Sequence, residues 1–595
     1  QFPEIVPPVV QVQASYPGAD PQVIADTVAA PIEQQVNGVD NMLYMSSQSA
    51  ADGSYNLNVT FELGTNIDMN TVLTQNRVSA ALAQLPEDVQ RLGVTTKKVS
   101  SALVLLLSVY SPEGKFDDLF ITNYVTINMK DTLNRIPGVG AITLYPAMDY
   151  SMRLWLDPEK LKARNITVED VVNALRQQNV QVAAGQLGQP PVPNNQTYQL
   201  NVNTLGRLQT VEEFEDIIIK TGEGTRAIRV RDMGKVELGG KAYDFESLFQ
   251  GKPACTMVVF QSPGSNAMQV TKQFLQTLQE LEKDFPPGME CRVIYKIADF
   301  VSASIHEVIE TLFIAFGLVV IVVFIFLQNW RATLIPLITI PVSIIGTFAV
   351  MSLVGFSINL VTLFGLILTI GLVVDDAIVV VENVERIMAE YGLKAKEAAI
   401  KSMEEVSGAV IGTTLVLMAV FIPPAFMGGI TGQIFRQFSL TIAIAMFFSA
   451  VNALTLSPAL CAILLRPRDQ STNVFFRTFN NSFSRATNFY TKVVSRGVRR
   501  IAVMMIIFLG LIVPTWLAYQ QIPSGFLPLE DDGLIIVNVQ MPDGAALGRT
   551  YEVVQRAGKI IQETEGVMVW GAQVGWSMID ASRSNLATIF VALKP

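Results

Sequence analysis

Residues 365–383 read GLILTIGLVVDDAIVVVEN, an apolar run of helical length that contains two adjacent carboxylates, Asp375 and Asp376. A charged side chain inside a membrane costs roughly 2.5–3.5 kcal/mol on insertion scales. The nearest cations, Arg386 and Lys394, lie beyond the end of the run. Two neighbouring carboxyl groups in such surroundings cannot both stay ionised cheaply, so one is expected to bind and release protons near neutral pH. A proton or ion relay is therefore favoured over a carboxyl pair that a polar neighbour merely satisfies.

The composition excludes several classes of protein. The chain has 595 residues, is 50% hydrophobic and has a mean hydropathy of +0.37, which is too apolar for one soluble domain of this length. Its net charge of −9 argues against a nucleic-acid partner. The cysteines Cys255, Cys291 and Cys461 have no metal-ligand spacing, and buried free thiols are favoured over a disulfide between the first two. The single His306 lacks partner ligands and is interpreted as an interfacial residue, not a metal site.

The apolar residues are concentrated in the middle of the chain. Residues 1–305 and 530–595 have the patterns of water-soluble α/β structure, whereas 306–520 holds nearly all the long apolar runs. Each run is near or above the ~20 residues that a bilayer requires. The candidate spans are 308–327, 334–354, 359–381, 408–427, 435–464 and 501–519. The 435–464 run is expected to extend beyond the membrane or to kink at Pro458.

The charges between the spans predict an orientation. The 466–500 linker is rich in Arg and Lys and has one acid, Asp469, which marks it as cytoplasmic. Counting back through the spans places 1–305 and 521–595 on the outer side. Residues 473–494, approximately, are expected to form an amphipathic helix on the inner leaflet.

Strand and helix patterns divide the first soluble region. Residues 1–101 predict one α/β sandwich subdomain, and 102–148 together with 241–298 predict a second. Residues 149–240 differ, because QVAAGQLGQPPVPNNQTYQL has Gly, Pro and Asn without a core pattern. An arm that docks on another subunit is favoured over a disordered loop.

The last soluble region repeats the first. Residues 534–577 match 9–47 in order: an alternating strand, a turn with Pro and Gly, a helix, a Gly-Val stop and a strand. Transporters are commonly built from such repeats. We therefore expect a fragment that lacks the membrane helix before Gln1 and most of the second repeat.

Several motifs resemble one family over the whole chain. GLVVDDAIVVVENVERIM, SYPGADPQVIADTVAAPIEQQVNGV and FLQNWRATLIPLITIPVSIIGTFA are similar to the resistance–nodulation–division superfamily, in its branch of hydrophobe/amphiphile multidrug efflux pumps of Gram-negative inner membranes. The resemblance implies an α+β membrane protein, with a polytopic helical domain (306–520), ferredoxin-like α/β sandwich porter subdomains and a docking subdomain (149–240). Residues 530–595 would begin the third porter subdomain.

The resemblance also implies a function. It predicts proton-driven antiport of amphiphilic drugs, dyes, detergents or solvents, with no enzymatic activity and no cofactor besides the proton motive force. The expected partners are two further copies in a homotrimer, a periplasmic adaptor protein, an outer-membrane channel and amphiphilic small molecules, but no nucleic acid.

The resemblance assigns roles to individual residues. Asp375 and Asp376 would carry protons, and Gly371 would let a neighbouring helix pack closely. The family's cationic partners lie on later helices that this sequence does not contain. The implied substrate pocket consists of Tyr145, Phe245, Trp570, Trp576, Phe590 and Leu103. Ordinary core packing remains the alternative for each aromatic residue. The implied trimer-locking arm includes Gly185, Gln186, Leu187, Gly188, Pro190 and Pro191.

Three other functions are less well supported by the sequence. Heavy-metal efflux in the same superfamily usually has one Asp at the relay site and uses Met ligands, whereas two Asp and no convincing Met pair occur here. A non-transporting scaffold or secretion accessory would not need the Asp pair. A hydrolytic enzyme lacks a Ser-His-Asp, Cys-His or metal-ligand set, and no phosphate-binding P-loop indicates ATP use.

Overall fold

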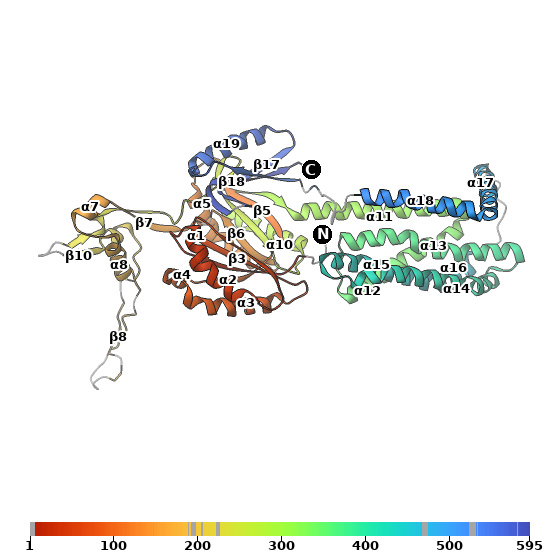
Figure 1. Ribbon diagram of the computed structural model, residues 1–595, viewed down its shortest axis with the longest axis horizontal. Helices are drawn as coiled ribbons and strands as arrows, with labels where there is room; N and C mark the ends of the chain where they lie inside the picture. The colour runs from red at the N-terminus through yellow and green to blue at the C-terminus, as the bar shows by residue number, and fades with distance from the viewer. Residues whose placement is uncertain are drawn as a thin grey trace.

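The computed structural model has a mixed α/β body, a bundle of long helices on one side of it and a small lobe with a narrow arm on the other (Figure 1). This combination of antiparallel sheets and long apolar helices confirms the predicted α+β class. The structure describes residues 6–100, 102–146, 148–181, 183–188, 190–191, 198–203, 206–221, 227–466, 474–522, 531, 533–579 and 581–594. Parts of the predicted arm (192–197), Arg468 and Asp469 of the basic linker, and the predicted start of the last region at 530 lie outside these residues.

The first sheet has the strand order β2–β3–β1–β4 with antiparallel neighbours. Its strands are β1 (Val9–Ser15), β2 (Met42–Ser49), β3 (Ser54–Phe61) and β4 (Thr95–Val99). Along β1, Val10 and Val12 are buried against helices, while Gln11 and Gln13 alternate with them and lie on the opposite face. The covering helical segments are α1 (Pro21–Ile24), η1 (Ala25–Ala29), α2 (Ala30–Val36), α3 (Ile67–Ala81) and α4 (Glu87–Leu92). The sheet therefore has one apolar and one polar face.

The second sheet joins segments that are far apart in the sequence. Its order is β15–β5–β14–β13–β17–β18–β16, and β6 also pairs with β14. The strands are β5 (Leu103–Tyr110), β6 (Val139–Tyr145), β13 (Glu246–Phe249), β14 (Lys252–Gln261), β15 (Glu290–Lys296), β16 (Leu534–Gln540), β17 (Val567–Ser577) and β18 (Ala581–Leu593). The junction is between β13 and β17, where Leu248 pairs with Ala572. The last soluble region thus extends the sheet that contains β5, β14 and β15.

Helices cover the second sheet. The segments α5 (Asp118–Val125), η3 (Thr126–Lys130), α6 (Asp131–Asn134) and α10 (Ala267–Leu281) pack on the part made from residues before 300. The helix α19 (Leu547–Glu563) packs on β17 and β18. Phe274 of α10 and Val554 of α19 are fully buried, so each helix seals a core of its own.

The small lobe is built around the pair β7–β12. Its elements are β7 (Tyr150–Leu156), α7 (Pro158–Ala163), α8 (Val168–Gln178), α9 (Val211–Glu215), β10 (Ile218–Thr221), β11 (Ala227–Arg229) and β12 (Gly234–Gly240). The short strands β8 (Gln186–Leu187) and β9 (Leu200–Asn201) pair antiparallel in the arm. Figure 1 shows β8 extending well away from the body.

Within the described residues, six helices are long and apolar enough to cross a membrane. They are α11 (Ile297–Leu327), α12 (Trp330–Val354), α13 (Leu360–Tyr391), α14 (Ala395–Phe421) with its short extension, α15 (Gly429–Leu454) continued by α16 (Leu456–Leu464), and α18 (Ile501–Gln521). The amphipathic α17 (Val474–Arg499) comes between α16 and α18 in the sequence. It contacts the end of α11 through Phe479, whose ring centroid lies 5.5 Å from that of Phe326.

The fifth of these helices is interrupted near Pro458. The regular helix ends at Leu454 and resumes at Leu456, with Thr455 between them. A proline ring clashes with the carbonyl group four residues earlier, which here belongs to Leu454. The break therefore falls three residues before Pro458, not at the proline itself.

Candidate functional site

The helix α13 places its two carboxylates in different surroundings. Asp376 is only 9% exposed, whereas Asp375 lies on a side of α13 that the described residues leave exposed. Thr362 and Thr369 are buried on the same helix. The positions 362, 369 and 376 are seven residues apart. Seven residues make about two turns of an α-helix, so the three side chains lie on nearly the same side of α13. The buried side of α13 therefore has a polar stripe that includes Asp376.

A serine on α15 contacts the buried carboxylate. Ser449 Oγ donates a hydrogen bond to Asp376 Oδ2 at 2.6 Å. Ser449 Oγ also lies 3.2 Å from the carbonyl oxygen of Val373. Ser449 is 2% exposed, so water does not compete for its hydroxyl group. The sequence reasoning missed Ser449, because a lone serine in an apolar run is common in membrane helices and indicates no partner by itself.

A second polar contact lies near Ser449. Asn452 Nδ2 donates to Ser343 Oγ of α12 at 2.8 Å, and both side chains are buried. Ser449 and Asn452 are three residues apart, so they project from neighbouring positions on one side of α15. We call the set Asp376, Ser449, Asn452 and Ser343 the three-helix seam, since it connects α12, α13 and α15 through polar contacts.

Near Gly371 and Asp375, the other side of α13 has no such contacts among the described residues. A Cβ atom at Gly371 would meet no described neighbour within 4 Å, and Asp375 follows one turn later on the same exposed side. Arg386 does not reach the pair, because it forms salt bridges with Glu390 and Glu405 near the end of the helix. The close helix packing that the resemblance implies at Gly371 stays a prediction.

Three of the predicted pocket residues form an aromatic cluster in the soluble body. The ring centroid of Tyr145 lies 5.3 Å from that of Trp576 and 6.3 Å from that of Phe245. These distances are within the range of favourable aromatic pairs. Burial raises the pKa of Tyr145, so this side chain stays protonated at physiological pH. The residues meet because β6 ends beside β14 and because β13 and β17 are neighbours in the sheet.

A glycine permits this convergence. Gly575 has a φ of +90°, and a Cβ atom there would lie 2.4 Å from the carbonyl oxygen of Asp244 and 2.7 Å from Cβ of Phe245. The pairing of β17 with β18 also shifts register between Val574 and Trp576. Only glycine fits both the backbone conformation and the close approach. The irregularity at Gly575 therefore brings Trp576 next to Phe245 and Tyr145.

The other three predicted pocket residues lie elsewhere. Trp570 is 2% exposed and packs in the core under α19, where a Cβ atom at Gly558 would lie 2.2 Å from its ring. Phe590 packs in a separate core group with Phe249, and Leu103 pairs with Phe260 at the start of β5. The resemblance implied one pocket for all six residues, whereas the sheet order and register place three of them in other parts of the body. The structure brings together only the aromatic cluster.

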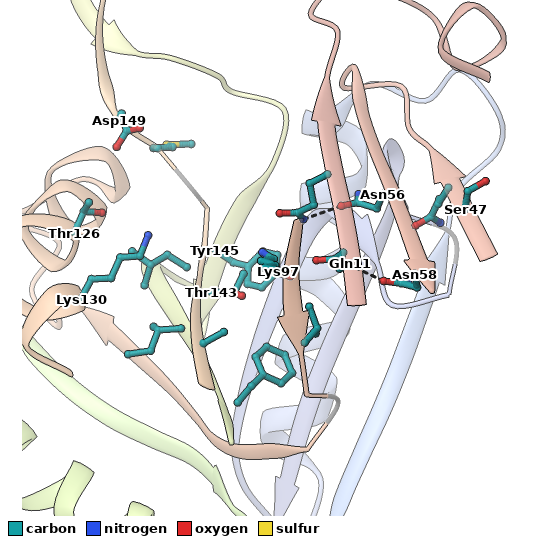
Figure 2. Close-up of a pocket in the computed structure, with 18 of the residues that line it drawn as sticks. Gln11, Ser47, Asn56, Asn58, Lys97, Thr126, Lys130, Thr143, Tyr145 and Asp149 are labelled. Atoms are coloured by element: carbon teal, nitrogen blue, oxygen red, sulfur yellow. Dashed lines mark hydrogen bonds between the residues drawn. The ribbon is translucent and has the colours of Figure 1, made fainter. Parts of the chain in front are cut away.

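A cavity of about 870 Å³ adjoins the aromatic cluster. It lies between the polar face of the first sheet and β6, and Tyr145 lines it (Figure 2). Two side-chain hydrogen bonds order the sheet wall: Gln11 Nε2 donates to Asn58 Oδ1 at 3.1 Å, and Gln13 Nε2 donates to Asn56 Oδ1 at 2.8 Å. Ligand pockets have volumes of roughly 300–1,000 Å³, so this one is large enough for a drug-sized molecule.

The sheet wall of this cavity was not predicted from the sequence. Alternating Gln and Asn in VVQVQAS and SYNLNVT predict a polar face, and such a face is usually interpreted as solvent-exposed. Two lysines that line the cavity, Lys97 on β4 and Lys130 in η3, were also not selected. No local pattern indicates that these residues face each other, since they come from separate subdomains.

The predicted arm lies apart from both sites. Gln186 and Leu187 are exposed, and the side chain of Leu187 is 62% accessible. Gly185, Gly188, Pro190 and Pro191 belong to the same projecting segment. An exposed leucine on a narrow hairpin is available for contact with another molecule, but its partner stays a prediction.

Comparison with known proteins decides the family. A family model described as the AcrB/AcrD/AcrF family matches residues 1–595. The chain belongs to this family. AcrB/AcrD/AcrF proteins are membrane transporters, not enzymes, and the chain is accordingly a multi-pass inner-membrane protein with periplasmic domains.

Curated relatives align with the entire chain. It is 42% identical over 602 residues to the multidrug export protein AcrF of Escherichia coli (strain K12), covering 100% of this chain and 58% of that protein. It is 41% identical over 605 residues to the toluene efflux pump membrane transporter TtgB of Pseudomonas putida, covering 100% and 57%. The multidrug resistance protein MdtF of Escherichia coli (strain K12) is 39% identical over 600 residues, with 100% and 58% covered. The chain thus spans less than two thirds of the length of these AcrB/AcrD/AcrF relatives.

Proposed function

We propose that the protein containing this chain exports amphiphilic organic molecules in exchange for protons. Its relatives have names that refer to multidrug export and to toluene efflux, which supports organic substrates over metal ions. The observation that carries the proposal is the buried carboxylate of Asp376 in the middle of a membrane-length helix, where Ser449 is its one side-chain donor among the described residues. Intramembrane carboxylates with so little compensation are typical of proton pathways.

The contact between Asp376 and Ser449 can exist in two forms. When Asp376 is ionised, the Ser449 hydroxyl donates to it. When Asp376 is protonated, its own O–H can donate to Ser449 Oγ, and the serine hydroxyl can turn to the carbonyl oxygen of Val373, which is 3.2 Å away. Both forms satisfy the groups involved, so a proton can be bound or released without a lost hydrogen bond. Proton binding then drives transport to the extent that the two forms favour different packing of α13.

A continuous element connects the bundle to the substrate region. The 31-residue helix α11 begins at Ile297, immediately after β15 of the second sheet, and it packs against α13. At 1.5 Å per residue it is about 46 Å long. In the proposed cycle, a shift of α13 moves α11 and thereby the sheet that holds the aromatic cluster. Substrates would bind to this cluster and in the adjoining cavity by stacking and apolar contact.

The partners are part of the same proposal. The exposed hairpin β8–β9 would insert into a neighbouring copy and so hold a homotrimer together. A periplasmic adaptor and an outer-membrane channel would complete the export path. Gly371 and the exposed side of α13 would be covered by a further helix of the transporter, which would bring a cation to Asp375.

The test is Asp376→Asn in the gene from which this chain comes, expressed in cells without other export pumps. The neutral side chain keeps the volume but cannot be protonated, so uncoupler-sensitive dye efflux should fall to the level of pump-free cells. Asp299→Asn is the control, because Asp299 is an exposed acid at the start of α11 that pairs with Lys296 at 2.9 Å. Unchanged efflux with Asp376→Asn would refute the relay. Efflux that never responds to an uncoupler, even in the unaltered protein, would instead favour a non-transporting scaffold.

A further inference from the structure

The cavity beside β6 contains two lysines with no carboxylate partner among the described residues. Lys97 and Lys130 both line it, and neither forms a salt bridge within 4.0 Å in that part of the chain. The neighbouring Lys98 behaves differently, since it points to the helical face of the sheet and pairs with Asp68 at 2.9 Å. Adjacent residues of one strand face opposite sides. Lys98, on the helical face of the sheet, is therefore paired with a carboxylate, whereas Lys97, on the cavity face, has no such partner among the described residues.

The surroundings make the charge of Lys97 costly. Partial burial lowers the pKa of the Lys97 ammonium group, and the like charge of Lys130 lowers this pKa further. Asp149 supplies the sole carboxylate among the described lining residues. Two cations therefore face one anion across the cavity. An additional negative charge in the cavity would relieve the repulsion between the lysines.

The lysines come from opposite walls. Lys97 lies on β4 directly beside Gln11 in the strand pairing, whereas Lys130 ends η3. Figure 2 shows Lys130 reaching toward the cavity from η3, with Thr143 and Tyr145 of β6 nearby. The amide groups of the sheet wall offer neutral hydrogen-bond partners, and Tyr145 leads to the aromatic cluster. The cavity thus has a polar part with two lysines and an aromatic end at Tyr145.

We infer that this cavity selects amphiphilic organic anions, with the acidic group between Lys97 and Lys130 and the apolar body directed toward Tyr145. The inference rests on the proposed function for the source of the substrate, and it adds the charge of the preferred substrate. A carboxylate or sulfonate on an aromatic body fits both parts of the cavity. A cationic amphiphile would add a third positive charge and is disfavoured.

The test compares two dyes with the same aromatic skeleton. Anilinonaphthalene sulfonate carries the anionic group, and phenylnaphthylamine lacks it. Binding of each to the purified full chain in lipid nanodiscs is measured by fluorescence titration. Lys97→Gln and Lys130→Gln should each weaken binding of the sulfonate about tenfold, since each removes one charge-assisted contact. Binding of phenylnaphthylamine should stay unchanged. Lys98→Gln is the matched control and should leave both affinities unaltered.

A charge-preserving variant separates binding from folding. Lys97→Arg keeps the cation and should retain sulfonate affinity within about twofold. Equal losses for both dyes, or no loss for the sulfonate in either Gln variant, would overturn the inference. The dye titration does not require transport. Sulfonate binding that depends on the lysines, together with unimpaired efflux by Asp376→Asn, would support the anion site and refute the proton relay. Sulfonate binding that does not depend on the lysines, together with lost efflux by Asp376→Asn, would refute the anion site and support the relay.

Discussion

The three-helix seam and the cavity beside β6 both hold polar groups inside the molecule, but they satisfy them in different ways. In the seam, Ser449 contacts Asp376 and Asn452 contacts Ser343, so partners within the chain meet at 2.6 and 2.8 Å. In the cavity, Lys97 and Lys130 face open space without a carboxylate partner among the described residues.

The difference follows from the surrounding medium. A buried polar group in a membrane bundle has no water to solvate it, so leaving it without a partner costs several kcal/mol. A cavity of about 870 Å³ admits water, which solvates a lysine until a ligand replaces it. The seam can therefore keep its hydrogen bonds while Asp376 binds or releases a proton. The cavity lysines keep their charges available for a ligand.

The largest effect is expected at the contact that defines the seam. Ser449→Ala removes the donor to the buried Asp376 carboxylate, and a lost hydrogen bond to a buried charged group costs about 1–3 kcal/mol. Dye efflux by the protein containing this chain should fall about tenfold, whereas Ser449→Thr keeps the hydroxyl group and should retain efflux. Ser457→Ala is the control, since Ser457 is buried in α16 and its hydroxyl has no hydrogen-bond partner among the described residues. Full efflux by Ser449→Ala would show that the seam is structural only.

A smaller effect is expected from the second contact of the seam. Asn452→Val leaves the buried Ser343 hydroxyl without its donor, and Ser343→Val leaves Asn452 Nδ2 with only its longer contact, 3.4 Å to the carbonyl oxygen of Thr339. Each change should destabilise the purified protein by about 1–2 kcal/mol. The double variant removes both groups, so it should be less destabilised than the sum of the single variants. Thermal unfolding of the four proteins measures the coupling. Strictly additive changes would mean that the 2.8 Å contact contributes nothing to stability.

The smallest effect concerns the pH dependence of the cavity. Lys97 binds an anion only while it is protonated, and desolvation and Lys130 lower its pKa. Sulfonate affinity should therefore fall severalfold as the pH rises, beginning below the ~10.4 at which an ordinary lysine loses its proton. Tyr145 faces the same cavity but keeps its proton, because burial raises its pKa; Lys130 and Asp149 are the other charged groups among the described lining residues.

The control for this pH titration is Lys97→Arg, whose guanidinium stays charged throughout. Its sulfonate affinity should persist to higher pH than that of the unaltered protein. Fluorescence titration of anilinonaphthalene sulfonate at a series of pH values gives both curves. Identical curves for the two proteins would exclude Lys97 as the titrating group.

The sequence predicted local features well where one physical pattern dominates. Long apolar runs located the membrane-length helices, since hydrocarbon requires about 20 apolar residues per crossing. Their ends were less accurate: α11 begins at Ile297 and not near 308, because the helix continues past the apolar run into the soluble body. Hydropathy detects only the apolar part of such a helix.

Long-range contacts were not predictable in the same way. Trp570 and Trp576 are six residues apart on β17, yet one is in the core and the other joins the aromatic cluster. The register shift at Gly575 determines this difference, and no property of the tryptophans themselves indicates it. The arm was recognised from its composition, but its partner is a property of an assembly.

The sequence by itself determined the α+β class, the membrane segment and the adjacent carboxylates, because hydropathy and charge act on neighbouring residues. Only the tertiary structure decided which carboxylate is buried, that Ser449 is its donor, and that β13 joins β17. It also brought Lys97 and Lys130 to one cavity. These relationships depend on the order and register in which distant segments pack. No short stretch of sequence indicates that order, because the contacts join residues that are far apart in the chain.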